Sequence, residues 1–168
     1  MEASLPFRIM VRGALVLDTP IVLVLVVGAV DPALLGSIQH LRAYNPDDYP
    51  LVLRIASSYT LIAVTPHVLT EVAYFITKVR GSTGAELRLK FGELVQAFRE
   101  RKPPTRRLAR RAEFRWLDVA DCSLLDAAGR NDVLFTGDAK LMDQQLRLGG
   151  QAINLNHLRD RAWADPGL

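Results

Sequence analysis

The sequence is poor in cysteine and in long apolar runs, and each shortage excludes a class of protein. Its 168 residues include a single cysteine, Cys122, so no disulfide can form within the chain and a reducing compartment is expected. The longest apolar run, Ile21 to Val30, is about half as long as a membrane helix requires and therefore predicts buried core. Residues 1–13 have neither the apolar stretch nor the cleavage site of a signal peptide. We therefore expect a cytoplasmic protein with no membrane partner.

The charge balance is mildly basic, and the composition is that of an ordinary globular domain. Lys and Arg number 21 against 18 Asp and Glu, a formal net charge of +3, which is compatible with a nucleic-acid partner without requiring one. Hydrophobic residues make up 49% and charged residues 23%, which predicts one compact domain over residues 1–168. A free cysteine is most often a small buried apolar residue, and we interpret Cys122 in this way rather than as a nucleophile.

Short apolar strands alternate with helices along the chain. Residues 15–17, 61–64, 133–135 and 152–153 have the apolar runs of buried strands. Helices are expected after Pro20, over about 45–59, after Pro66, over about 85–98, over 118–129 and over 138–148. Thr19-Pro20 and Thr65-Pro66 each supply a cap followed by proline, so the β-branched run after Pro20 is interpreted as a buried helix rather than a strand. The alternation predicts a three-layer α/β/α domain with a mostly parallel central sheet.

Four carboxylates fall at the same end of this predicted sheet: Asp18, Glu71, Asp121 and Asp138. Asp18 ends the first strand and Asp138 follows the third, and loops at the carboxyl ends of parallel strands line the binding crevice. Glu71 lies in the second turn of the helix after the second strand, and Asp121 lies in the first turn of the helix before the third. Helical spacing puts each acid at the top of an apolar face, whereas Asp126 lies off that face and is expected to contact water.

Crowded, partly buried carboxylates repel one another, so a cation must compensate for their charge. Oxygen ligands without a nearby histidine suit Mg²⁺ or Mn²⁺ better than Zn²⁺. Such an ion activates a water and neutralises charge on a phosphate, as phosphodiester hydrolysis requires. Taken singly, each acid has an ordinary explanation: Asp18 and Asp138 suit helix N-termini, Asp121 suits a capping arrangement with Asp118, and Glu71 suits an exposed edge. Their convergence at one end of one sheet favours the metal site.

The same segments resemble, in order, the four motifs of the PIN-domain nucleases. LVLDTPIVL is similar to the opening strand and helix of that family, VTPHVLTEV to its second motif, VADCSLLDAA to its third and VLFTGDAKL to its fourth. The resemblance covers residues 14 to 148 approximately. It implies a PIN fold related to flap-nuclease and VapC-type toxin domains, in which the four matching acids bind one or two divalent ions and support RNA hydrolysis. By the same match, Thr136 would order the site through its hydroxyl.

The sequence departs from the family at one position and is longer at another. Family members usually have asparagine or serine two residues after the first aspartate, and here Pro20 removes that side-chain hydrogen bond. Residues 32–58 exceed what compact members need, and we interpret them as a helical arm for partner contacts. The partners expected from the resemblance are RNA, a protein antitoxin and a second copy of the chain in a homodimer.

The segment from Arg99 to Arg111 is strongly basic, with seven Lys and Arg residues and one acid. We expect it to contact the RNA backbone, although a solvated connection that only aids solubility is the alternative. The residues expected to make these contacts are Arg106, Arg107, Arg110 and Arg111. No aromatic residue is interleaved among them, and Phe114 and Trp116 are expected in the core. His67 could take part in proton transfer, but an exposed histidine without a role is the preferred interpretation.

Three functions are compatible with these residues. The favoured one is a metal-dependent endoribonuclease, as in the toxin of a toxin–antitoxin pair. The second is a PIN-fold module that binds RNA or protein with little activity; Pro20 favours it and the four retained acids oppose it. The third is a phosphotransfer domain, which is disfavoured because such domains place paired acids near the first strand, whereas Asp18 is followed by Thr19 and Pro20.

Overall fold

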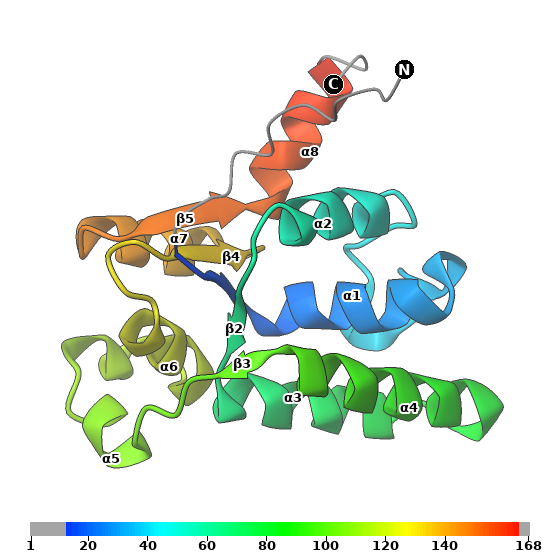
Figure 1. Ribbon diagram of the computed structural model, residues 1–168, viewed down its shortest axis with the longest axis horizontal. Coiled ribbons are helices and arrows are strands. Elements are labelled where there is room, and N and C mark those ends of the chain that lie inside the picture. The colour runs from blue at the N-terminus through cyan, green and yellow to red at the C-terminus, as the bar shows by residue number, and fades with distance from the viewer. Residues whose placement is uncertain (1–12, 165–168) are drawn as a thin grey trace, which may run out of the picture.

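Five parallel strands form one sheet at the centre of the protein (Figure 1). The computed structural model describes residues 13–164; residues 1–12, on which the signal-peptide expectation rests, and residues 165–168 lie outside the described residues. The strands are β1 Leu15–Leu17, β2 Ile62–Val64, β3 Arg99–Glu100, β4 Val133–Thr136 and β5 Gln151–Asn154. Their order across the sheet is β3-β2-β1-β4-β5, and each neighbouring pair is parallel. The predicted parallel sheet is confirmed.

Helices cover both faces of this sheet and complete the three predicted layers (Figure 1). Right-handed connections place the helices between β1 and β3 on one face, and those that lead to β4 and β5 on the other. Consistently, α7 packs on β4 and β5, whereas α1 packs against α2, α3 and α4. The α-helices are α1 Thr19–Val30, α2 Asp48–Ser57, α3 Pro66–Thr77, α4 Gly81–Ala97, α5 Thr105–Leu108, α6 Val119–Ala127, α7 Ala139–Arg147 and α8 Leu155–Ala164.

Local capping signals start the helices at the carboxyl edge of the sheet. Thr65 caps α3 and Asp118 caps α6 through their side chains, as predicted. The predicted cap of α1 is wrong by one residue: the Asp18 carboxylate accepts from the Thr19 N–H, and Thr19 is already helical. The correction has a physical reason, because a charged carboxylate after an extended residue is a strong acceptor for the free N–H groups of a helix start. Asp138 caps α7 in the same way.

The apolar run after Pro20 is a helix because it is buried on every side. Every residue from Ile21 to Gly28 is buried, and strand propensity is overridden by the cap and by packing between α2, α3 and α4. Gly28 lets α2 approach closely, since a Cβ at this position would overlap the ring of Tyr49. Across residues 13–164, no helix combines the length and the hydropathy that a bilayer span requires.

Residues 32–58 are helical but do not project as an arm. They form two short 3₁₀ turns, η1 Pro32–Leu34 and η2 Gln39–Leu41, followed by α2. Leu35, Leu41 and Val52 are buried in the common core, and α2 lies along α1. The arm expected from the family resemblance is therefore packed onto the domain, because its apolar residues have a surface to bury against.

The sequence mispredicts the environment of two aromatic residues, and it does not indicate two of the secondary-structure elements. Phe114 is 40% and Trp116 60% exposed, although both were expected in the core. The turn that carries Phe114, η3 Ala112–Arg115, instead points Glu113 inward, where the carboxylate pairs with Arg111 and accepts a hydrogen bond from Gln144. The elements β3 and α8 were not expected at all, since neither has an alternating or amphipathic apolar pattern of useful length.

Candidate functional site

The four predicted acids lie at one edge of the sheet. Asp18 follows β1 and Asp138 follows β4, which are neighbouring parallel strands. Glu71 comes from α3, and Asp121 from the first turn of α6. The negative charges of Asp18, Asp138 and Glu71 all act on Asp121, so the four carboxylates share one electrostatic field. Parallel strand direction is what brings residues so distant in sequence to a common edge.

Asp18 is the most buried of the four and is held by both of its oxygens. Oδ1 accepts from the Thr19 N–H at 2.6 Å, and Oδ2 accepts from the Thr136 hydroxyl at 2.6 Å. The Thr136 Oγ1 in turn accepts from the Asp138 N–H at 2.9 Å, so one hydroxyl joins the two aspartates. Burial, with the charges of Asp138 and Glu71 added, raises the pKa of Asp18 to about 6 despite these hydrogen bonds. Thr136 therefore lies where a site-ordering hydroxyl is expected.

Glu71 is tied to the start of α1 by Thr19, which the sequence predicts only as a helix cap. The Thr19 hydroxyl donates to Glu71 Oε2 at 2.7 Å. Burial and the charge of Asp118 raise the pKa of Glu71, while the Thr19 hydrogen bond and His67 act in the opposite direction. Pro20 cannot supply the polar group expected at its position, and the hydroxyl one residue earlier supplies a hydrogen bond to the same group of carboxylates.

Asp121 has the strongest perturbation in the site. Burial comes first among its causes, followed by the charges of Asp118, Asp18, Asp138 and Glu71, and together they raise the pKa of Asp121 to about 8. Asp118 was predicted only as a cap, and it does accept from the Asp121 N–H at 2.8 Å. It is also a fifth negative charge beside the site. Proximity of Asp118 to Glu71 depends on how α3 and α6 pack, which no local pattern reveals.

The donor set fits a hard divalent cation. Within residues 13–160, none of the ion pairs to Lys or Arg involves the four carboxylates, and only His67 is seen to offset part of the charge, at Glu71. Oxygen ligands of this kind suit Mg²⁺ or Mn²⁺. In the same described part of the chain, no three His, Cys, Asp or Glu side chains are arranged to hold an ion as they stand.

Tyr44 is a further neighbour of the acids that sequence reasoning missed. Burial and the charges of Asp18, Asp48 and Asp138 outweigh the effect of Arg159 and raise the pKa of Tyr44 to about 12. The residue precedes α2 and is half-buried. No signal in the sequence marks it, because its contact with the segment after β4 is purely tertiary.

The basic segment lies beside α6, and its arginines fall into two groups. Arg107 and Arg111 both pair with Asp126, which contradicts the expectation that Asp126 faces water. The helical-phase reasoning failed there because α5 covers that side of α6. Arg106 and Arg110 are exposed, and within the described residues neither forms an ion pair with an acid. Arg106 and Arg110 are therefore the arginines of this segment that are available to contact a backbone phosphate, whereas Arg107 and Arg111 support the fold through Asp126.

His67 connects the basic segment to the site. Its Nε2 is 2.9 Å from the Thr105 hydroxyl at the start of α5, and its charge acts on Glu71. The ring is half-buried rather than exposed, which corrects the expected environment. Its Nδ1 and the Nδ2 of Asn154, which ends β5, are buried without a hydrogen-bond partner among the described residues. Both atoms belong to the carboxyl edge of the sheet, where a ligand can satisfy them.

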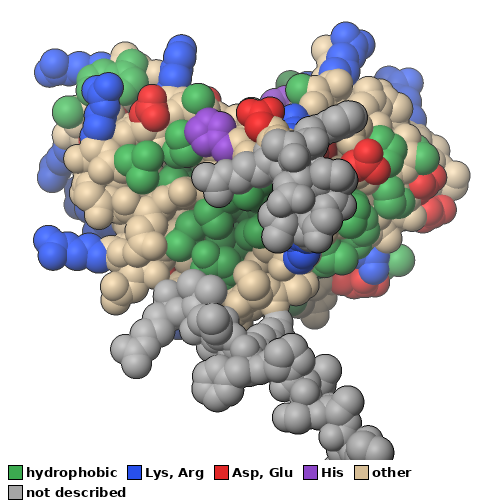
Figure 2. Space-filling model, turned by 90° about the horizontal axis from the view of Figure 1, so that it is seen from above, with side chains coloured by type: hydrophobic (Ala, Val, Ile, Leu, Met, Phe, Trp, Pro, Cys, Tyr) green, Lys and Arg blue, Asp and Glu red, His purple; other side chains and the backbone are tan. Residues whose placement is uncertain are grey.

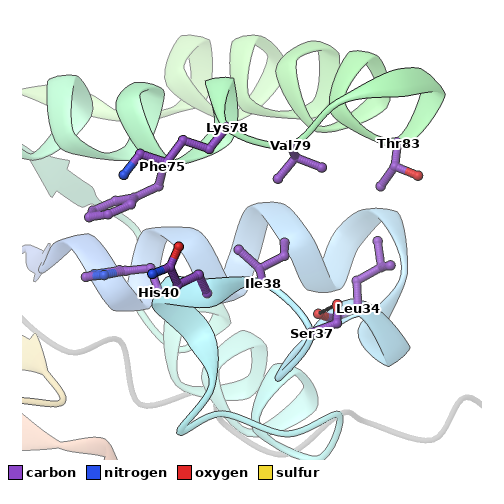
Figure 3. A pocket seen from close by; sticks show the side chains of 9 residues that line it. Leu34, Ser37, Ile38, His40, Phe75, Lys78, Val79 and Thr83 are labelled. Atoms are coloured by element: carbon purple, nitrogen blue, oxygen red, sulfur yellow. Dashed lines mark hydrogen bonds between the residues drawn. The ribbon is translucent and has the colours of Figure 1, made fainter.

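A groove of about 520 Å³ opens next to α3 (Figure 3). The rings of Phe75 and His40 stack at one end with centroids 3.7 Å apart, and Lys78 lies near them on the same side as Phe75. None of the four acids lines this groove, although Phe75 is one helical turn beyond Glu71. On the face seen in Figure 2, Lys and Arg side chains project mostly from the edges, with hydrophobic side chains between them.

No known family model matches the chain, and no curated protein sequence is significantly similar to it. The resemblance to PIN domains therefore depends on the four sequence motifs alone.

Proposed function

We propose that the protein is a metal-dependent endoribonuclease of the PIN-domain type, which hydrolyses RNA phosphodiester bonds. The observation that carries the proposal is the convergence of Asp18, Glu71 and Asp138 on Asp121, where burial first and then the charges of these acids and Asp118 raise the pKa of Asp121 to about 8. Groups so perturbed at the carboxyl edge of a parallel sheet are typical of functional sites. An ordinary helix cap needs no such crowding.

Each side chain has a role in this proposal. Asp18 and Asp138 would hold the ion, and the Thr136 hydroxyl links the Asp18 carboxylate to the backbone N–H of Asp138. Glu71, oriented by Thr19, and Asp121 would complete the ligand set. When bound, Mg²⁺ or Mn²⁺ supplies an activated water and neutralises charge on the phosphate. Arg106 and Arg110 would contact the RNA backbone away from the carboxylates.

The likeness to VapC-type toxins extends the proposal to a role as the toxin of a toxin–antitoxin pair. A protein antitoxin and a second copy of the chain are then the expected partners. A PIN-fold binding module with little activity is the second candidate, and Pro20 is the observation that favours it. The hydrogen bond from Thr19 to Glu71 weighs against it, because the site retains an ordered carboxylate without a polar residue at position 20.

The proposal is tested with the purified protein and structured RNA. Cleavage should require Mg²⁺ or Mn²⁺, stop in EDTA, and fall by several orders of magnitude in Asp18→Asn and Asp138→Asn. Each ion should also raise the midpoint of thermal unfolding of the wild type, since it binds only the folded state. Stabilisation by metal without cleavage would favour the binding module. Cleavage that persists in EDTA and in Asp138→Asn would rule out the proposed mechanism.

A further inference from the structure

Gly137, between two residues of the candidate site, makes room for a tyrosine hydroxyl. A Cβ built on Gly137 would lie 2.6 Å from the Tyr44 Oη and 3.8 Å from its Cζ. Gly137 is not among the glycines with positive φ, so its backbone conformation does not demand glycine. The space over its Cα is therefore what excludes a side chain, and the Tyr44 hydroxyl fills that space. This contact places the hydroxyl against the backbone that joins Thr136 to Asp138.

A network from the C-terminal helix fixes the position of Tyr44. Arg159 of α8 donates from Nε and Nη2 to the two oxygens of Asp48 at 2.6 and 2.5 Å, and from Nη2 to the carbonyl of Ala43. Its guanidinium also lies 5.0 Å from the centre of the Tyr44 ring. Asp48 is only 2% exposed, so this bidentate pair is shielded from water. Arg159 thus binds the chain both before Tyr44, at Ala43, and after it, at Asp48, and so holds the tyrosine in place.

The same helix reaches the backbone beneath the hydroxyl. Asn156 donates from Nδ2 to the Gly137 carbonyl at 3.0 Å, and it accepts from Arg159 at 2.8 Å. Tyr44 and Gly137 are therefore both anchored to α8. The hydrogen bonds of Asn156 and Arg159 therefore hold the two sides of the contact between Tyr44 and Gly137 in place.

The Tyr44 hydroxyl is a hydrogen-bond donor without an acceptor among the described residues. Within residues 13–160 it makes no hydrogen bond, and it is not one of the buried atoms without a partner, so a ligand that approaches from solvent can reach it. A phenol is already neutral at physiological pH at its ordinary pKa of 10.0, so the hydroxyl keeps its proton. A neutral donor beside Asp18 and Asp138 adds no negative charge to the site, and it suits an anionic ligand that approaches these acids.

We infer that the Tyr44 hydroxyl is a further functional group of the site and donates a hydrogen bond to a phosphate oxygen of the bound RNA next to Asp138. The inference rests on the proposed ribonuclease function for the identity of the ligand. It explains why residue 137 is a glycine, since the Tyr44 hydroxyl occupies the space that a side chain there would fill. It also assigns a purpose to the Arg159–Asp48 pair, which positions the donor.

The placement is tested by a double-mutant cycle on stability. Gly137→Ala should lower the midpoint of thermal unfolding in the wild type but much less in Tyr44→Phe, because the nearest ring atom is then Cζ at an ordinary 3.8 Å. Gly28 and Tyr49 form the matched control, since there a Cβ would meet ring carbons rather than the hydroxyl. Tyr49→Phe should therefore not relieve Gly28→Ala. Equal losses from Gly137→Ala in both backgrounds would overturn the inference.

The role is tested by single-turnover cleavage and by binding of a short fluorescein-labelled RNA to Asp138→Asn, which is not expected to cleave it. Tyr44→Phe should slow cleavage, and should weaken binding in the Asp138→Asn background, each by roughly 10-fold to 100-fold, the factor for one hydrogen bond to a charged group. Tyr49→Phe should change neither. If Tyr44→Phe cleaves and binds as well as the wild type, the inference is wrong and the proposed function stands. If the wild type does not cleave RNA, the proposed function fails, and the binding comparison alone decides the role of Tyr44.

Discussion

The Thr19 hydroxyl donates a 2.7 Å hydrogen bond to Glu71 Oε2 and so joins the first turn of α1 to α3. Thr19 also donates its backbone N–H to Asp18, the cap of its own helix. One residue therefore orients two of the four carboxylates: its backbone N–H binds Asp18, and its side-chain hydroxyl binds Glu71. Its neighbour Pro20, which lacks a polar side chain, can take the first turn of the helix without loss of this arrangement.

Thr19→Val should lower the affinity for Mn²⁺ by roughly 10-fold to 100-fold, the usual effect of removing a hydrogen bond that orients a metal ligand. Valine keeps the shape of threonine, so the fold should remain. The pKa of Glu71 should rise further, because the Thr19 hydrogen bond is one of the two influences that lower it. Calorimetric titration with Mn²⁺ measures the affinity. Thr70→Val is the control, since that hydroxyl donates only to the Pro66 carbonyl on the exposed side of α3. An unchanged Mn²⁺ affinity in Thr19→Val would remove Thr19 from the site.

Asp121→Asn should stabilise the metal-free protein in a pH-dependent way. Burial and nearby charges raise the pKa of Asp121 from its ordinary 3.8 to about 8 in the folded state. Between these values the folded state binds the proton more tightly than the unfolded chain does, so the stability of the wild type falls as pH rises through this window. The variant lacks that dependence. Urea unfolding in EDTA should show equal stabilities below pH 3.8 and a growing advantage for Asp121→Asn up to about pH 8. A variant less stable than the wild type at pH 8 would contradict the crowding of the carboxylates.

Asp132→Asn should destabilise the protein at neutral pH. Asp132 is 7% exposed, pairs with Arg101 and accepts hydrogen bonds from the N–H groups of Ala14 and Gly129. Burial alone would raise the pKa of Asp132, but these partners outweigh it and the pKa lies below its usual range. The contribution is therefore present above pH 3.8 and is lost as pH falls through the lowered folded value. We expect a loss of about 3 kcal/mol at pH 7, at the lower end for breaking a buried pair because Arg101 is partly solvated. Chemical unfolding from pH 7 downward should show the gap between the two proteins narrowing; a constant gap would assign the effect to packing.

The two groups of arginines should separate in mutagenesis. Arg106→Ala with Arg110→Ala should weaken RNA binding and reduce the salt slope by roughly 1.4, at about 0.7 for each single-strand phosphate contact. The free energy of unfolding of this double variant should stay within about 0.5 kcal/mol of the wild type. Arg107→Ala with Arg111→Ala should instead lower stability, since Asp126 would lose its partners. Fluorescence anisotropy across a salt series and thermal unfolding give the two readings. An unchanged salt slope in the first variant would return this segment to a solubilising connection.

The parts of the fold that local chemistry controls could be predicted from the sequence. Thr65-Pro66 and Asp118 mark helix starts that the structure retains, and the buried runs of β1, β2 and β4 require nothing beyond their own hydropathy. Parallel strand order then brings Asp18 and Asp138 to one edge. In contrast, β3 has two exposed polar residues at the margin of the sheet, so its pairing with β2 leaves no pattern to detect.

The environment of individual side chains was harder to predict, because it depends on which element covers which. Asp126 was expected in water since the helix α6 was considered alone, and α5 supplies the arginines that pair with it. Trp116 was expected in the core rather than as a platform for bases, yet Glu113 takes the inward position. Tyr44 and Thr19 join the site through contacts with residues far away in sequence. Spacing within one helix carries no information about such neighbours.

The strand order also sets the time at which the site comes into existence during synthesis. β1 is made first but lies in the middle of the sheet, with β2 on one side and β4 on the other. Until β4 leaves the ribosome, one edge of β1 has no hydrogen-bond partner, and Asp18 lacks the hydroxyl of Thr136. The helix that anchors Tyr44 emerges later still. A growing chain therefore carries Asp18 as an ordinary acid until β4 has been made, and the carboxylate site assembles only after Asp138 has followed that strand.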